Sequence, residues 1–285
     1  MNILNSGKIP KYLLSSDASL LQAQGLAVLP KIYGKYFKLF DGLELVGTRW
    51  IGGTLKQAQQ LGLKTVCIHG RMAGIGDFER TWERPIMFLL NQSLISTEKL
   101  AKICEQNGFE ALVHAPELRK PTSFQALVDY KEKLRCVWVE NHPSVDKHLA
   151  LTQAVSFVRK LREQGVKAKL VFDICHAIDW QNLTGPDFPQ AFYQALDWLK
   201  KCCQIGSLGL HIGIGTAPRD SLPIANESLL TDEMLKDLAA LIRRFKIKRV
   251  VVEYSANIFD LLIQKTGSAQ VGVERLVKTG IIKAA

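Results

Sequence analysis

Acidic and histidine side chains recur where hydrophobic stretches of the chain end. The segment 170–179, LVFDICHAID, begins as an apolar run and then places Asp173 and His176 three residues apart. At the end of a strand, this spacing lets both side chains face one cavity. Other apolar runs end in the same residue types, namely His69, His114, Glu140, His211 and Glu253. Imidazole and carboxylate groups bind divalent metal ions and transfer protons, so the pattern indicates one of these two chemistries.

Short apolar stretches alternate with amphipathic helical stretches along the 285 residues. The pattern predicts strands at 11–15, 42–46, 65–69, 111–114, 136–140, 170–173, 208–211 and 249–253. Among the helices it predicts between them are 149–164, 188–201 and 231–245. Such alternation is typical of βαβ units and a parallel sheet. Eight units predict an α/β fold with a closed (β/α)8 TIM barrel, which we expect to form a single domain over residues 1–285. A doubly wound open sheet is the alternative, but no Gly-x-Gly-x-x-Gly follows the first predicted strand.

In a (β/α)8 barrel the C-terminal strand ends form one mouth, where functional residues lie. Side chains alternate between the barrel interior and the helix layer, and this count turns the acidic and histidine residues inward together. Three buried carboxylates without matching lysines or arginines would be costly unless a cation neutralised them. The sequence therefore predicts a site for one or two divalent metal ions at the mouth.

The donor types select the metal and leave two reactions open. Imidazole with carboxylate suits Zn²⁺, Mn²⁺ or Fe²⁺, and we expect Zn²⁺ or Mn²⁺. One four-ligand set consists of Glu140, Asp173, His211 and Glu253. A second ion would be held by His69 and His114, with Glu140 bridging. Two ions would suit hydrolysis of a phosphate ester, whereas one ion flanked by two glutamates would suit proton abstraction next to a carbonyl.

Further polar residues lie close in sequence to these strand ends. His142 is two residues past Glu140 and can face the mouth, although Pro143 also suits a structural loop. Arg219 follows the seventh predicted strand, where it can bind a hydroxyl, carboxylate or phosphate or remain a surface charge. Gly213 and Gly215 predict a loop whose backbone comes close to a ligand or to a helix end.

The composition limits location and partners. The net charge is +10, and basic runs at 160–169, 200–201 and 243–249 end predicted helices or begin the next strand. They suit the helix dipole and would lie on the barrel face opposite the active site, so they are weak support for DNA binding. Six cysteines without a CxxC pair predict reduced thiols in a cytoplasmic protein. No apolar run of membrane-spanning length and no signal peptide are expected.

Five phrases together resemble the xylose isomerase-like TIM-barrel superfamily, which includes sugar isomerases and epimerases and endonuclease IV-type apurinic endonucleases. These phrases are FDGLEL, VENHP, FDICHA, LHIG and VVE. The resemblance covers residues 11–260 and implies metal ligation by Glu140, Asp173, His211 and Glu253. In the epimerase branch the two glutamates also move the proton. His176 matches the histidine of that family's Asp-x-x-His, and Arg219 lies near a substrate-binding arginine.

The endonuclease branch fits less completely. It adds two histidines on the third and fourth strands, which His69 and His114 match. Its third zinc needs an Asp-x-His after the seventh strand, where this chain has Arg219-Asp220-Ser221. Its opening Ser-His-Val-Ser type motif is replaced by SSDAS at 15–19. These departures argue against a three-metal DNA-cleaving site and leave a one- or two-metal barrel intact.

We therefore expect a divalent-metal-dependent isomerase or epimerase that acts by proton transfer on a sugar, a sugar phosphate or a related polyol. Glu140 and Glu253 would be catalytic, and His142, His176 and Arg219 would contact the substrate. The alternative is an endonuclease IV-like phosphodiesterase with a reduced metal site and nucleic acid as its partner. A third reading is a degenerate barrel that serves as a binding module.

Overall fold

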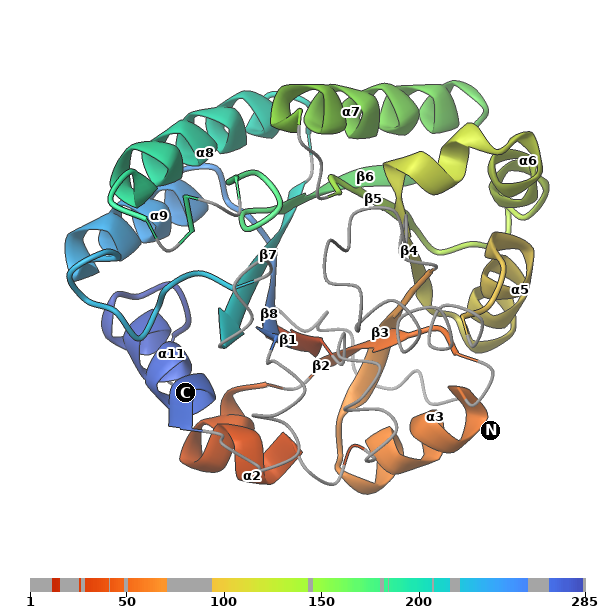
Figure 1. Ribbon diagram of the computed structural model, residues 1–285. Coiled ribbons are helices and arrows are strands. Elements are labelled where there is room, and N and C mark those ends of the chain that lie inside the picture. The colour runs from red at the N-terminus through yellow and green to blue at the C-terminus, as the bar shows by residue number, and fades with distance from the viewer. Residues whose placement is uncertain are drawn as a thin grey trace, which may run out of the picture.

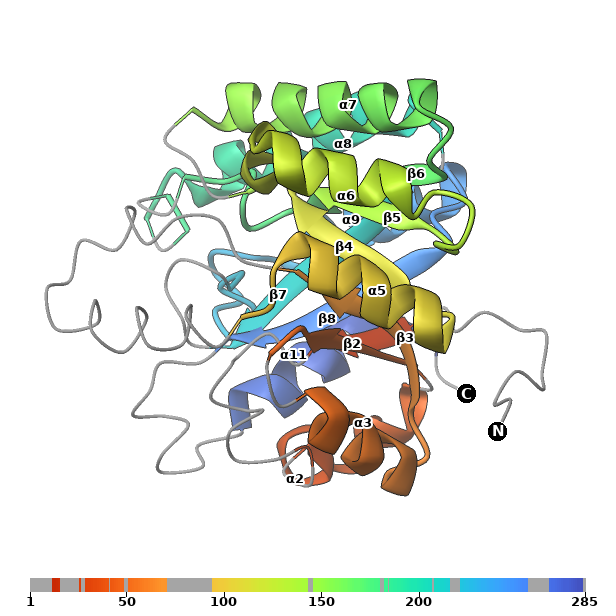
Figure 2. The same cartoon turned by 90° about the vertical axis from the view of Figure 1, so that its right-hand side faces the viewer.

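Eight parallel strands close into a barrel in chain order, with β1 paired to β8. The computed structural model describes residues 12–15, 26, 29–40, 42–48, 51–70, 94–142, 146–179, 182–183, 185–206, 208–215, 221–255 and 267–283. The strands lie in the middle of the molecule and the helices surround them (Figure 1). The view turned by 90° shows α7 and α8 along one side of the barrel and α2 and α3 along the other (Figure 2). The predicted (β/α)8 fold is confirmed, and the open sheet is excluded.

The strands are short and lie close to their predicted positions. They are β1 Tyr12–Ser15, β2 Gly42–Val46, β3 Lys64–His69, β4 Glu110–His114, β5 Val137–Glu140, β6 Ala168–Asp173, β7 Leu208–Gly215 and β8 Arg249–Ser255. The α-helices of the described residues are α2 Leu29–Tyr33, α3 Ile51–Gln60, α5 Thr97–Asn107, α6 Pro121–Asp129, α7 Lys147–Glu163, α8 Phe188–Cys203, α9 Asp232–Arg244 and α11 Gly267–Lys278. Two 3-10 helices, η2 Gly34–Leu39 and η4 Ala115–Arg119, complete them.

Side-chain caps begin three of the long helices. The side chains of Ser96, Asp146 and Thr231 each accept a hydrogen bond from the backbone N–H three residues later. These bonds satisfy donors that have no partner within the helix. The apolar faces of the helices then pack on the outer face of the strands in one large core. No helix in the described ranges is long and apolar enough to cross a membrane.

The barrel interior is layered because inward residues recur with period two along each strand. A middle layer of Cys67, Leu112, Trp138 and Val171 forms an apolar cluster. Gly209 belongs to the same layer, and a Cβ there would lie 3.1 Å from the Trp138 ring. Glycine at this position therefore leaves the room that the indole occupies. This apolar layer separates the two ends of the barrel interior.

Strands β7 and β8 run further than their sequences predict. His211 and Glu253 were expected to end them, but the ladder continues to a Gly215–Ser255 pair. Gly213 and Gly215 therefore lie in a strand, and the expected loop at these glycines is wrong. Pairing with β8 supplies the hydrogen bonds that a loop would have lacked. His211 and Glu253 nevertheless point inward, because their parity along the strands is unchanged.

Candidate metal centre

Six side chains predicted to face the mouth meet in the barrel interior. None exposes more than 4% of its surface. Their nitrogen and oxygen atoms form two overlapping groups, in each of which the ligand atoms lie within 4.8 Å of one another. One group consists of His69, His114 and Glu140, and the other of Glu140, Asp173, His211 and Glu253. The sequence-predicted ligand set is thus brought together in full, with Glu140 shared by both groups.

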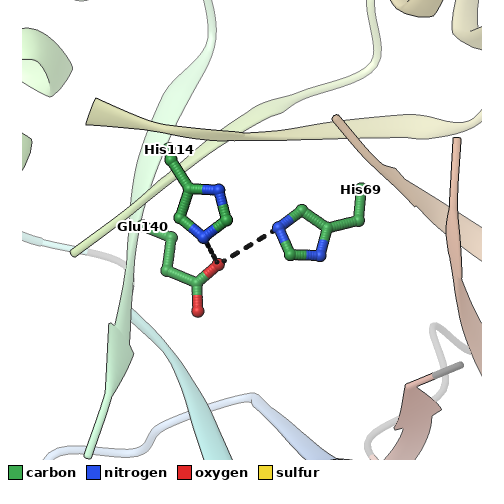
Figure 3. Close-up of side chains that lie close together, drawn as sticks. All are labelled: His69, His114 and Glu140. Atoms are coloured by element: carbon green, nitrogen blue, oxygen red, sulfur yellow. Dashed lines mark ion pairs between the residues drawn. The ribbon is translucent and has the colours of Figure 1, made fainter. Parts of the chain in front are cut away.

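The smaller group joins β3, β4 and β5. His69 Nε2 lies 3.4 Å from Glu140 Oε2, and His114 Nε2 lies 3.3 Å from the same oxygen. The two imidazole rings converge on this oxygen from different strands (Figure 3). Their ring centroids are 4.8 Å apart. Two ring nitrogens and one carboxylate oxygen this close together could supply three ligands to one metal ion.

The larger group joins the ends of β5 and β6 to β7 and β8. His211 Nδ1 lies 3.0 Å from Glu140 Oε1 and 2.8 Å from Glu253 Oε1. Asp173 and His211 are direct neighbours in the β6–β7 ladder, which brings the Asp173 carboxylate to the same place. The two oxygens of Glu140 therefore face different groups, Oε2 toward the two histidines and Oε1 toward His211. This geometry is the one expected of a bridging carboxylate.

Several buried atoms of the cluster make no hydrogen bond of regular geometry among the described residues, although some of them take part in the ion pairs above. They are Glu140 Oε2, Glu253 Oε1, both ring nitrogens of His211 and Glu44 Oε1. Buried polar atoms in folded proteins are nearly always hydrogen-bonded or bound to an ion. The donor set of nitrogen and oxygen atoms suits a divalent transition metal. On both counts these residues fit a metal centre.

The surroundings shift the pKa values of Glu140 and Glu253 in opposite directions. Burial raises the pKa of Glu253 to about 7, and Asp173 and Glu140 add to this although His211 opposes it. Burial also acts on Glu140, but the neighbouring histidines outweigh it and hold the pKa of Glu140 well below its usual range. Burial lowers the pKa of His211, while the surrounding carboxylates raise it well above the usual value. The two glutamates therefore differ in acidity, with the pKa of Glu140 lowered and that of Glu253 raised.

Glu44 on β2 belongs to the cluster and was not predicted. It is fully buried. Its Oε1 lies 3.6 Å from His211 Nε2 and 4.0 Å from His69 Nδ1. Its Oε2 pairs with Arg249 Nη2 at 2.5 Å. A carboxylate beside the outer nitrogen of a ligating histidine orients the ring and raises its basicity. The available signal was a glutamate in the middle of the apolar strand GLELV.

Asn141 is a second residue that sequence reasoning missed. Its side-chain amide donates to the Asp173 carbonyl at 2.9 Å and accepts from the Asp173 N–H at 2.8 Å. Its own carbonyl oxygen lies 2.9 Å from His176 Nδ1. The Asp173 carboxylate in turn accepts from the His176 N–H at 2.8 Å. Asn141 therefore fixes the end of β6, and with it the directions of Asp173 and His176.

The predicted substrate contacts have different outcomes. His176 Nδ1 lies 4.0 Å from both Glu140 Oε1 and Asp173 Oδ2, and at 9% its exposure exceeds that of every ligand candidate. His176 is therefore the most exposed of the residues around the cluster. His142 follows β5, is half-buried and belongs to neither ligand group. Arg219 lies outside the described residues.

Comparisons with known proteins agree with the observed architecture. No family model matches the sequence, and no curated protein matches it either. Among solved structures, the chain is similar to an L-ribulose 3-epimerase, with a TM-score of 0.51 and 13% identity over 96% of this chain and 95% of that one. It is also similar to a sugar phosphate isomerase/epimerase from Parabacteroides distasonis, with a TM-score of 0.51 and 12% identity over 99% of both chains.

A third similar structure shows how widely this barrel is used. It is an uncharacterised protein from Clostridium thermocellum that binds two copies of 5-methyl-5,6,7,8-tetrahydrofolic acid, with a TM-score of 0.50 and 10% identity over 93% of this chain and 95% of that one. At such identities the likeness is one of fold. The chain thus has the fold of the xylose isomerase-like TIM barrels, as its sequence phrases indicate.

Proposed function

We propose that the chain is a divalent-metal-dependent isomerase or epimerase that moves a proton on a sugar, a sugar phosphate or a related polyol. The observation that carries the proposal is the complete four-ligand group of Glu140, Asp173, His211 and Glu253, in which two glutamates flank the place for a single ion. The similar structures of L-ribulose 3-epimerase and of a sugar phosphate isomerase/epimerase support the substrate class. The same barrel is used for other ligands, so the site residues must decide the chemistry.

Glu140, Asp173, His211 and Glu253 would hold the catalytic ion. His69 and His114 would hold a second ion or contact the substrate. A bound divalent ion supplies a Lewis acid that polarises a carbonyl oxygen and holds neighbouring oxygens. The nitrogen and oxygen donors favour Zn²⁺ or Mn²⁺. Glu44 would keep His211 turned so that Nδ1, the nitrogen nearest Glu140 and Glu253, faces the ion.

Glu140 and Glu253 would exchange the proton with the carbon next to the carbonyl. A carboxylate beside the substrate carbonyl can accept a proton from the neighbouring carbon and return it, and burial raises the pKa of Glu253, which favours its role as the group that returns the proton. The pKa of Glu140 is lowered by the neighbouring histidines, which favours its role as the other base. His176, which lies 4.0 Å from both Glu140 and Asp173, would bind a substrate hydroxyl. Arg219 is proposed to orient the substrate from the segment after β7, and His142 from the segment after β5.

Phosphodiester hydrolysis is the second candidate. The group formed by His69, His114 and Glu140 favours it, because two adjacent ions are an arrangement that suits phosphate-ester hydrolysis. The missing Asp-x-His motif argues against the three-metal version. We place isomerisation first because the four-ligand group is complete without a second ion.

The test incubates metal-loaded protein with a panel of ketoses and their phosphates in deuterated water, and separately with a duplex that contains an abasic site. Metal content per chain is measured in parallel. We expect one or two ions per chain and solvent deuterium in the sugar. Glu140→Gln should abolish the incorporation of deuterium into the sugar and should release most of the bound metal. The matched control is Glu163→Gln, an exposed position on α7, which should change neither.

Two results would redirect the proposal. Nicking of the abasic strand that is lost in Glu140→Gln, without sugar turnover, would establish the hydrolase instead. If the folded wild-type protein binds no divalent ion, metal-dependent catalysis is ruled out altogether.

A further inference from the structure

A basic cavity of about 880 Å³ lies at the opposite end of the barrel from the metal centre. The first residues of β4, β7 and β8 line it, namely Glu110, Leu208 and Arg249, which places it at the N-terminal strand ends. Its cationic lining consists of Lys169, Arg243, Lys246, Lys248, Arg249 and Lys283. The last residue of the basic run at 160–169 and most cations of the run at 243–249 therefore meet here.

Most of this positive charge is not neutralised within the described part of the chain. Glu110 is the one carboxylate in the lining, and it already pairs with Arg249 Nη1 at 2.9 Å and accepts from Trp138 Nε1 at 2.8 Å. Arg249 also pairs with Glu44. The remaining lysines and Arg243 make no ion pair with a carboxylate of the described residues. Like charges gathered around one cavity repel each other, and an anion would relieve that repulsion.

Lys246 occupies a backbone position where four other helix ends have glycine. The structure has Gly62, Gly108, Gly165 and Gly280 in the left-handed region, with φ between 66° and 83°. Each donates its N–H to the carbonyl three residues earlier, and the next residue donates to the carbonyl five residues earlier. After α9 the same two bonds run from Lys246 to Arg243 and from Ile247 to Ile242, with φ of 52° at Lys246. Lys246 is the one non-glycine residue with positive φ in the described ranges.

A side chain at this position is unfavourable, because the left-handed region crowds Cβ against the backbone. Its side chain is exposed and lines the cavity, so packing does not explain it. Strained residues that persist in a fold gather at functional sites. The lysine and the uncompensated charge around it are two separate observations that point to the same cavity.

We propose that this cavity binds a small anion that carries two or more phosphate groups. The volume lies within the range of small-molecule sites. The charge exceeds what one phosphate would neutralise. Lys169 Nζ and Arg249 Cζ lie 4.9 Å and 4.7 Å from the Trp138 ring centroid, and Arg244 lies over the Phe245 ring. Cations already occupy these aromatic rings, so recognition runs through phosphate oxygens rather than through base stacking.

The site is independent of the proposed catalysis. The apolar layer around Trp138 separates it from the ligand groups, and none of its lysines belongs to them. Glu44 and Arg249 form the connection between the two ends. Loss of metal binding at the mouth would therefore leave the cavity intact.

The test measures binding of phosphate, pyrophosphate and tripolyphosphate by titration calorimetry, together with the melting temperature. Affinity should rise along this series, with about one tripolyphosphate bound at the cavity per chain. Lys246→Gly should melt roughly 1–3 °C higher, because it relieves the left-handed strain. The same variant should bind tripolyphosphate about 3- to 10-fold more weakly, because it loses one charged contact. A variant that is more stable yet binds more weakly cannot be explained by damage to the fold.

Three controls make the result decisive. Polyphosphates also bind divalent ions, so some tripolyphosphate could bind at the mouth rather than at the cavity. The double variant with Lys246→Gly and Lys248→Gln separates the two, because only binding at the cavity should weaken in it. Lys99→Gln, on the exposed face of α5, removes one charge elsewhere and should leave affinity unchanged. Equal tripolyphosphate affinity in the wild type and the double variant would overturn the proposal. A single-stranded oligonucleotide that binds more tightly than tripolyphosphate through the same lysines would also overturn it in favour of nucleic acid.

Discussion

The two ends of the barrel are built from the same strands and carry opposite chemistry. On β6 the inward row runs from Lys169 through Val171 to Asp173, and on β8 it runs from Arg249 through Val251 to Glu253. Each row therefore begins with a cation, passes an apolar residue and ends with a carboxylate. The ends of these rows at the mouth join the ligand groups, and their first residues line the basic cavity.

The contrast shows how little sequence separates two sites in such a fold. Because inward side chains recur every second residue, a five-residue strand has three inward positions, of which the middle one insulates the outer two. Glu44 is where the insulation ends, since its carboxylate lies between Arg249 and His211. Functional residues of this barrel type lie at the C-terminal end, while the opposite end is usually left to stability. The lysine-lined cavity departs from that division.

The largest effect is expected at the mouth alone. Glu140→Gln removes the carboxylate shared by both ligand groups, so it should lower turnover by about 10²–10⁴-fold and release bound metal. Tripolyphosphate binding at the other end should be unchanged. Parallel measurement of metal content, turnover and calorimetric binding checks this. A loss at both ends would mean that the two sites are coupled, and the contrast would fail.

Glu44→Gln should affect the mouth and the fold together. Loss of the carboxylate beside His211 Nε2 should weaken metal binding by about 10- to 100-fold. Arg249 keeps Glu110 as a partner, so the cost in unfolding free energy should be about 2–3 kcal/mol, below that of fully breaking a buried pair. Metal titration and chemical denaturation measure the two effects. Unchanged metal affinity would remove Glu44 from the site.

The acid sensitivity of the fold gives a second test of Glu44. Burial raises the pKa of Glu44, but His211, Arg249 and His69 outweigh it and lower the pKa from 4.5 to about 2. A carboxyl whose pKa is lower in the folded chain stabilises the fold above its unfolded pKa, and this contribution is lost as pH falls from about 4.5 toward 2. Stability measured across this interval should fall less steeply in Glu44→Gln than in the wild type. Parallel pH curves would contradict the assignment.

Replacing both His69 and His114 by alanine should separate the two ligand groups. The larger group does not contain these histidines, so it should keep its ion. If two ions bind the wild type, one should remain in the double variant, and turnover should fall by about tenfold or less. Metal analysis with single-turnover assays tests the expectation. Unchanged stoichiometry and activity would reduce the histidines to structural residues.

Much of the mouth could be predicted from sequence, and the reason is geometric. His69, His114, Glu140 and Asp173 stand at the ends of apolar runs, where strand parity and the closed barrel fix their direction. His211 and Glu253 were placed correctly although their strands run further, since extending a strand does not change the parity of its residues.

The missing parts were residues whose role depends on distant partners. Glu44 lies within an apolar strand, and its partners His211 and Arg249 are both far away in the sequence. Asn141 acts through the backbone of β6, a contact that no spacing in its own segment indicates. The basic runs were predicted to lie on the far face, but no spacing in them indicated that Lys169 and the run at 243–249 line a common cavity.

The smallest effect is expected from a substitution of Lys169, which lies at the start of β6, the strand that ends in Asp173. Lys169→Met keeps the apolar stem over Trp138 and removes the charge, so only the cation–π contact at 4.9 Å is lost. Such a contact contributes about 0.5–1 kcal/mol when partly exposed, which is roughly the expected fall in unfolding free energy. Relief of repulsion from the other cations reduces that fall further.

Turnover and metal content should be unchanged in Lys169→Met, because Val171 separates Lys169 from Asp173 along the inward row. The affinity for tripolyphosphate should drop about 3-fold. Chemical denaturation, turnover and calorimetry on one preparation give all three values. A loss of turnover in this variant would show that the apolar layer does not insulate the metal centre from the basic end.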